Sequence, residues 1–193
     1  SVTIPSKVVI DGKTYSVVRI HDYAFENCKG LTNITIPSSV ESIGTEAFKN
    51  SGLTTIELPS SITSFGYAVF KSCSFLVSVK IPSSVESIGE SAFADCTSLT
   101  NLELSSNVKI IGVMAFSGCE NLDLVIDNSE DNVEVRPQAF QNCKSVTCRD
   151  RKAKEKARID RIVKRIVGDN PQNVSRWREY LAYAVAFCMG FCY

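Results

Sequence analysis

The amino-acid sequence predicts a repeat solenoid, built mostly from short parallel β-strands and loops, with a C-terminal α-helical hairpin. Three observations support this fold class. A unit of about 23 residues occurs six times in the first three quarters of the 193-residue chain. Each unit is too short to bury its own apolar edge and needs neighbours on which to stack. After residue 148, the apolar residues change to the spacing of an amphipathic helix.

The repeat is anchored by an apolar residue followed by Phe. Five copies read Ala-Phe, and the third reads Val-Phe; the pairs end at Phe25, Phe48, Phe70, Phe93, Phe116 and Phe140. Successive Phe residues are 23, 22, 23, 23 and 24 positions apart. The second copy has lost one residue within Lys49-Asn50-Ser51-Gly52, and we attribute to this deletion both its missing Cys and the spacing of 22.

Each part of the unit has an expected conformation. Alternating segments such as Ile34-Thr35-Ile36 precede a proline, as expected for a half-buried strand that stops there. A second extended piece, such as Val40 to Ile43, ends at a glycine that we expect to adopt positive φ. His21 takes the glycine slot of the first copy, where we expect the same conformation. One helical turn, such as Thr45 to Phe48, then directs the Phe inward.

The consensus Ile-Pro-Ser-Ser-Val-x-Ser-Ile-Gly-x-x-Ala-Phe-x-x-Cys-x-x-Leu resembles the leucine-rich repeats of the Treponema pallidum/BspA-like class. It can be followed from Ile81 to Leu99 and, with one deletion, from Ile36 to Leu53. The resemblance covers residues 1 to about 148. It implies an α/β leucine-rich repeat solenoid, curved and right-handed, with a ladder of short parallel strands on one face. Members of this class are typically surface-exposed or secreted binding proteins of host-associated bacteria.

We divide the chain into a solenoid at residues 1–148 and a tail at 149–193. Val8-Val9-Ile10-Asp11-Gly12 begins two β-rich runs around an Asp-Gly turn, which predicts a hairpin that we interpret as the N-terminal cap. The tail holds 11 of the 21 Lys and Arg but 5 of the 21 Asp and Glu, so it is basic by six. Gly168-Asp169-Asn170-Pro171 would separate its two helices.

Three interpretations of this basic helical hairpin remain open. It caps the last coil, or it docks a partner or a second copy through Trp177 and Tyr180, or its basic face binds nucleic acid or a membrane surface. Nucleic acid is the disfavoured partner, because three acidic residues interrupt the basic run. A membrane span is not expected, since the longest apolar stretch has 13 residues and a spanning helix needs about 20.

Catalytic, cofactor and metal sites are not predicted. Five of the eight cysteines lie three residues after the Phe, and we expect them to stack as a column of small buried groups; they are Cys28, Cys73, Cys96, Cys119 and Cys143. A disulfide from Cys148 to Cys188 or Cys192 is an alternative that would join the tail to the repeats. The cysteines lack the close pairs of zinc sites, and His21 is the only histidine.

We therefore expect a non-enzymatic binding protein, an adhesin-like module at the cell surface or secreted, that recognises a protein or the extracellular matrix. The candidate contact residues form a line across the exposed strand ladder: Thr35, Glu57, Lys80 and Glu103. This face lacks the aromatic or Arg anchors that a tight interface usually has, so we expect a weak or multivalent contact. The alternative is a structural or assembly module whose helical tail makes the partner or self-association contact.

Overall fold

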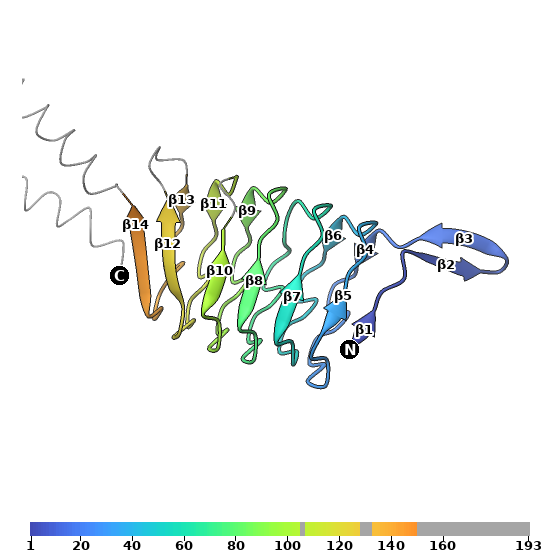
Figure 1. Cartoon of the computed structure of the whole chain (residues 1–193), viewed down its shortest axis with the longest axis horizontal. Helices are drawn as coiled ribbons and strands as arrows, with labels where there is room; N and C mark the ends of the chain where they lie inside the picture. The colour runs from blue at the N-terminus through green and yellow to red at the C-terminus, as the bar shows by residue number, and fades with distance from the viewer. Residues whose placement is uncertain (105–106, 128–132, 150–193) are drawn as a thin grey trace, which may run out of the picture.

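The computed structural model describes residues 1–104, 107–127 and 133–149, which form a row of stacked coils (Figure 1). We number the coils 1 to 6 by their repeat phenylalanines: Phe25, Phe48, Phe70, Phe93, Phe116 and Phe140. The solenoid is confirmed, and its last described strand ends at Arg149. The helical hairpin predicted for the tail lies beyond that residue, outside the described part of the chain.

One side of the stack is a ladder of short parallel strands, each of which comes before a turn of the coil (Figure 1). Its strands are β1 (Val2–Thr3), β5 (Ile34–Thr35), β7 (Thr55–Glu57), β8 (Ser78–Lys80), β10 (Asn101–Glu103), β12 (Asp123–Asp127) and β14 (Ser145–Arg149). In β5, β7, β8 and β12 the inward residues, such as Ile56 and Val79, are buried, whereas Leu102 of β10 and Val146 of β14 are partly buried and Val2 of β1 is exposed. The outward side of this ladder is called the ladder face below.

The predicted second extended piece of each coil is present, and these pieces form another parallel series that was not predicted. Its strands are β4 (Arg19–Ile20), β6 (Ser42–Ile43), β9 (Ser87–Ile88), β11 (Ile110–Ile111) and β13 (Glu134–Val135). Coil 3 joins this series through single bridges at Ser64 and Phe65. The two series enclose the core, in which the Phe rings of successive coils stack with centroids 5.1–5.5 Å apart.

The segment around each Phe is a run of tight turns, so the predicted helical turn is wrong. In coil 2, Glu46 and Asn50 both have φ of +53°, which no α-helix permits. The N–H groups of Glu46, Phe48 and Asn50 donate instead to carbonyl oxygens of coil 3, at 2.8–2.9 Å. A helix would use these donors internally, whereas the turns leave them free to join one coil to the next.

Close packing between coils explains why a glycine ends the second extended piece in coils 2 to 5. We call these residues the glycine column: Gly44, Gly66, Gly89 and Gly112. The positive φ predicted for them is wrong. Among the described glycines, only Gly12 and Gly118 have positive φ. A Cβ on Gly89 would lie 2.8 Å from the carbonyl oxygen of Gly66 in the preceding coil. His21 fills this slot without positive φ in coil 1, where the described chain has no preceding coil to obstruct its side chain.

The predicted hairpin is present as β2 (Lys7–Ile10) and β3 (Lys13–Ser16), which pair in antiparallel fashion across a turn with Asp11 at φ +51° and Gly12 at φ +73°. It is an insertion into coil 1: Ile4-Pro5-Ser6 repeats the strand-ending motif, and β1 pairs with β5. The hairpin projects away from the stack (Figure 1). The interpretation of the hairpin as a cap stays a prediction.

Candidate binding surface

The register of the ladder places the predicted charged line in one row. Glu57 lies opposite Lys80, and Lys80 opposite Glu103, across the paired strands β7, β8 and β10. Thr35 is exposed on β5, one strand further along, and Glu57 and Lys80 are exposed as well. The other two predicted contact residues, Trp177 and Tyr180, lie outside the described residues.

An exposed apolar pair lies beside the ladder face, at the entry to β8, and its aromatic member was not predicted from the sequence. Phe75 is 63% exposed and Val77 is 42% exposed, in the loop that leads into β8 and directly before its first residue. Leu76 between them points into the core and is fully buried. The described strands of the ladder carry no aromatic residue, but Phe75 supplies an exposed aromatic ring in the turn beside them.

The signal for Phe75 was present in the repeat alignment. The residue before the buried Leu is Gly52 in the preceding copy and Ser98 in the next one, so a large aromatic ring is the exception at this position. The loop into β7 is one residue shorter, and Gly52 there packs so closely that a Cβ would meet the carbonyl oxygen of Lys29. The ring of Phe75 thus stands between a shorter loop and a small serine, which explains its exposure.

The shorter loop also corrects the account of the second copy. Ser51 occupies the cysteine slot, because its N–H donates to the carbonyl of Phe48 at 3.1 Å, as that of Cys73 does to Phe70. The Ser51 hydroxyl lies 3.3 Å from the thiol of Cys73. Coil 2 therefore has Ser51 in place of the repeat Cys. The residue that this coil lacks is one of the two that separate the Cys from the buried Leu in coil 3.

The cysteine column is buried in its middle, as predicted, but each thiol also forms a hydrogen bond. The thiols of Cys73, Cys96, Cys119 and Cys143 donate to the Phe carbonyl of the preceding coil at 3.0–3.2 Å. Burial raises the pKa of Cys119 to about 12 and that of Cys96 well above its usual value. Burial therefore keeps these thiols protonated, which suits packing rather than nucleophilic chemistry.

Cys28 departs from the column. This thiol of coil 1 is exposed, so the prediction of a buried group is wrong there. The described chain has no coil in front of coil 1 to cover the thiol or to supply a Phe carbonyl. The disulfide considered for Cys148 involves Cys188 or Cys192, which lie outside the described residues.

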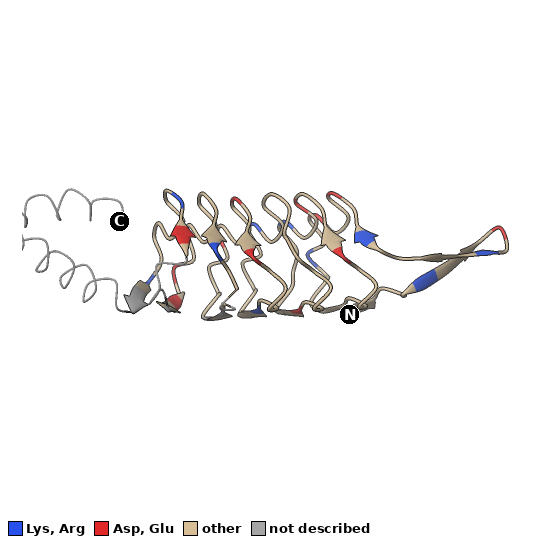
Figure 2. Ribbon diagram, turned by 90° about the horizontal axis from the view of Figure 1, so that it is seen from above, with Lys and Arg blue, Asp and Glu red and all other residues tan. Residues whose placement is uncertain are grey.

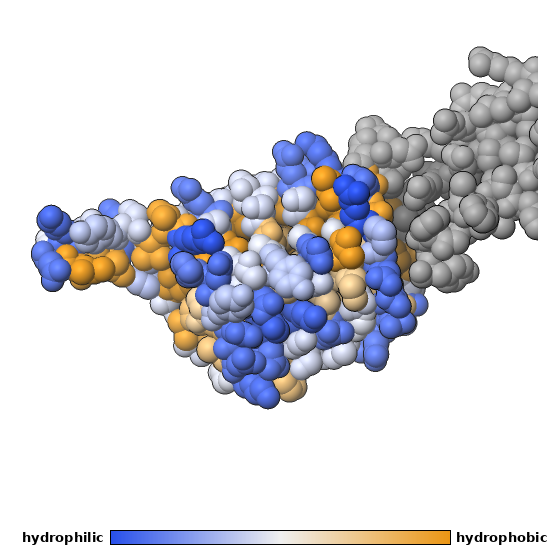
Figure 3. All heavy atoms as spheres, turned by 180° about the vertical axis from the view of Figure 1, so that it is seen from behind, coloured by the Kyte–Doolittle hydropathy of each residue, from blue (hydrophilic) through white to orange (hydrophobic). Residues whose placement is uncertain are grey.

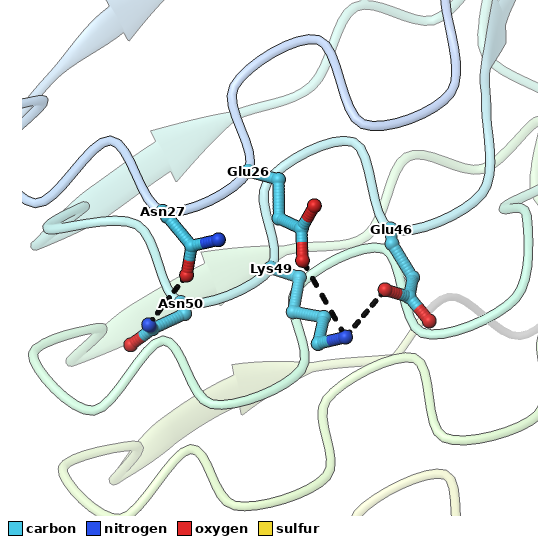
Figure 4. A network of polar contacts seen from close by, with 5 residues as sticks. All are labelled: Glu26, Asn27, Glu46, Lys49 and Asn50. Atoms are coloured by element: carbon cyan, nitrogen blue, oxygen red, sulfur yellow. Dashed lines mark hydrogen bonds and ion pairs between the residues drawn. The ribbon is translucent and has the colours of Figure 1, made fainter.

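Polar side chains in the turn segments around Phe25 and Phe48 link coil 1 to coil 2. Lys49 of coil 2 forms ion pairs with Glu46 of its own coil and Glu26 of coil 1, and Asn50 donates to Asn27 at 2.7 Å (Figure 4). The hydrogen bond that the Lys49 ammonium group donates to the Glu46 carboxylate raises the pKa of Lys49 above its usual value. None of the ion pairs in the described part of the chain involves Glu57 or Lys80.

Among the described residues we looked for a metal site, a basic nucleic-acid-binding stripe and a membrane-spanning helix. They contain no cluster of three metal-ligating side chains. Acidic and basic residues are scattered along the coils rather than gathered in a basic stripe (Figure 2). No helix among these residues is long and apolar enough to cross a membrane.

Solved structures of bacterial repeat proteins resemble this chain. A T. pallidum leucine-rich repeat protein is 29% identical, with a TM-score of 0.58 over 81% of this chain and 80% of that one. The pneumococcal vaccine antigen PcpA is 29% identical, with a TM-score of 0.62 over 75% of this chain and 38% of that one. A leucine-rich repeat protein from Bacteroides ovatus is 29% identical, with a TM-score of 0.55 over 75% and 44%.

The chain spans less than half the length of the last two of these proteins. A comparison with curated proteins gives no match. The family model described as a BspA type leucine rich repeat region matches residues 16–147 in six copies, and no enzyme family is indicated. The chain therefore belongs to the family of BspA-type leucine-rich repeat proteins.

Proposed function

We propose that this protein is a non-enzymatic binding module, exposed at a cell surface or secreted, that recognises a protein or matrix partner through its ladder face. The observation that carries the proposal is the exposed pair Phe75 and Val77 at the entry to the central strand β8. On a surface of hydroxyl and charged side chains, one aromatic residue surrounded by polar groups has the composition of a binding hot spot.

The energetic gain from covering this pair is moderate. Full burial of a Phe side chain contributes about 1.5–3 kcal/mol, and Phe75 still has 63% of its surface to lose. Val77 adds a smaller amount, and the row containing Glu57 and Lys80 supplies polar contacts beside it. One such site supports a weak contact, which several copies of the module on one surface would strengthen by multivalency.

The surface location is supported by similarity to other family members. PcpA, which matches this chain at 29% identity, is named as a vaccine antigen. A location on the cell surface or outside the cell would expose the ladder face to proteins and matrix. Antibody labelling of intact source cells tests it: labelling without permeabilisation is expected, and labelling only after permeabilisation would contradict the proposal.

Binding is tested with the full chain on immobilised extracellular matrix proteins and on intact host cells. Replacing Phe75 by Ser, the residue at this position in the next copy, is expected to weaken binding about tenfold. Lys80→Glu should change the salt dependence of binding, because it places an acidic group between Glu57 and Glu103 in the row.

Tyr67→Ser is the matched control, because Tyr67 is an exposed aromatic residue in the turn segment, away from the ladder. It should leave binding unchanged. Equal losses for the two aromatic variants would contradict a ladder-face site. Loss of binding only on deletion of residues 149–193, with the solenoid still folded, would favour the assembly module instead.

A further inference from the structure

The hairpin inserted into coil 1 is almost entirely exposed. All residues of β3 are exposed, and Val8 alone in β2 is partly covered. Val9 is 70%, Ile10 55% and Tyr15 49% exposed, and apolar surface is visible along the hairpin in Figure 3. Its two strands pair only with each other in the described chain. Two-stranded ribbons of this kind are marginally stable in water, whereas three or more strands with an apolar face persist.

The alternation of hydrogen-bonded and non-bonded pairs across the hairpin shows which backbone groups of β2 face away from β3. Val17 N–H donates to the Ser6 carbonyl at 2.9 Å, so this pair is bonded across the hairpin. In an antiparallel ladder, bonded and non-bonded pairs alternate. The pairs of Val8 with Tyr15 and Ile10 with Lys13 are therefore bonded, and the N–H and C=O groups of Lys7 and Val9 point away from β3.

We propose that a second copy of this chain pairs with that outer edge, β2 against β2 in antiparallel fashion, with a two-fold axis at Val9. The two Val9 residues would then exchange both backbone hydrogen bonds, and the two ribbons would become one four-stranded sheet. This contact is isologous, so it closes at a dimer. It is a further function of the hairpin and does not depend on what the ladder face binds.

The sequence of β2 is self-complementary in this register. With Val9 opposite Val9, Val8 of each copy lies opposite Ile10 of the other, so apolar residues face apolar residues. Such apolar cross-strand pairs are favourable. Lys7 of each copy lies at the end of the contact where the turn of the other copy begins, and the turn residue Asp11 there carries the opposite charge.

Other registers and the other edge lack this complementarity. An axis at Lys7 would place two ammonium groups opposite each other, which is unfavourable. An axis at Val8 would place Lys7 opposite Val9 and would extend the pairing to Pro5, which has no N–H. On the outer edge of β3, an axis at Thr14 places Lys13 opposite Tyr15 and pairs no two aliphatic residues.

The contact is small, because it joins strands of four residues. Interfaces of this size are transient rather than obligate. We expect a reversible monomer–dimer equilibrium with a dissociation constant of roughly 10 µM to 1 mM.

Sedimentation equilibrium of the full chain and two proline variants tests the pairing. Val9→Pro removes an outward donor and leaves the bonds between β2 and β3 in place, since proline is tolerated where the N–H faces solvent. It is expected to weaken the dimer at least about tenfold, because two backbone hydrogen bonds are lost. Thr14→Pro makes the same change on the outer edge of β3, and its dimer should be as strong as that of the unchanged chain.

A second pair of variants keeps the test decisive if either proline disturbs the hairpin. Val9→Lys places two ammonium groups opposite each other at the axis and should give monomers, whereas Thr14→Lys should not. Amide hydrogen exchange at Val9 should also slow as protein concentration rises, with exchange at Thr14 unchanged. A chain that remains monomeric throughout the range, or a dimer that Val9→Pro and Val9→Lys leave intact, would overturn the inference.

Discussion

Coils 1 and 4 carry the same repeat in different surroundings. Phe93 and Cys96 of coil 4 are fully buried, whereas Phe25 of coil 1 is partly buried and Cys28 is exposed. The difference lies on the N-terminal side of each coil, where coil 4 has a neighbour and coil 1 has none in the described chain. The comparison shows that the neighbouring coil gives several repeat positions their structural role, because each coil supplies the carbonyl groups and the wall against which the next one packs.

The largest effect on stability is expected from removing one of the stacked Phe rings of the core. Phe93→Ala should lower the free energy of unfolding by about 3–5 kcal/mol, because the fully buried Phe93 ring stacks on Phe70 and Phe116. Phe25→Ala should cost less than half as much, since Phe25 is partly exposed and stacks on Phe48 alone. Urea unfolding of both variants measures the difference, and equal losses would show that the coils are energetically equivalent.

The glycine column gives the next largest effect. Gly89→Ala places a Cβ 2.8 Å from the Gly66 carbonyl oxygen, so the coils must separate, at a cost of about 1–3 kcal/mol. His21→Ala, at the same slot of coil 1, should change stability by less than about 0.5 kcal/mol. Thermal unfolding compares the two, and a Gly89→Ala variant as stable as the parent would mean that the stack absorbs a methyl group freely.

The stability of the fold at alkaline pH tests whether the buried thiols stay protonated in the folded chain. The pKa of Cys119 is about 12 in the folded chain and 9.0 in its ordinary state, so the unfolded chain loses this proton first. The stability that this thiol contributes is complete below pH 9 and falls toward pH 12, by up to about 1.4 kcal/mol per pH unit. Urea unfolding at several alkaline pH values should show a shallower decline for Cys119→Ser, because Ser does not titrate there.

Cys28→Ser in coil 1 is the matched control for this measurement, because Cys28 is exposed. It should leave the alkaline decline as it is. An identical decline for the Cys119→Ser variant and the parent would show that other groups determine the alkaline behaviour.

The smallest effect on stability is expected from the ion pairs of Lys49, which join the turn segments of coils 1 and 2. Lys49→Met removes the ion pairs with Glu26 and Glu46 but keeps the length of the side chain. Ion pairs near the protein surface contribute little and are weakened by salt, and these side chains are partly exposed. The difference in melting temperature from the parent should be small at low salt and should shrink at high salt. A large, salt-independent loss would indicate a packing role for this side chain.

The repeat in the sequence determined the coil period, the inward residues of both strand series, the Phe column and the hairpin. These features follow from local spacing: strand alternation, turn residues such as Asp11-Gly12 and the return of Phe at each coil. The row of Glu57, Lys80 and Glu103 followed from the same spacing, because copies in register place equal positions side by side.

Only the tertiary structure decided the features that depend on contact between coils. The turns around each Phe replace a helical turn because N–H groups such as that of Phe48 bond to the next coil. Gly89 is required by the neighbouring backbone, and Phe75 is exposed because the adjacent loop is one residue shorter. In each case the deciding partner lies about one repeat away in the chain and becomes a neighbour only when the coils stack.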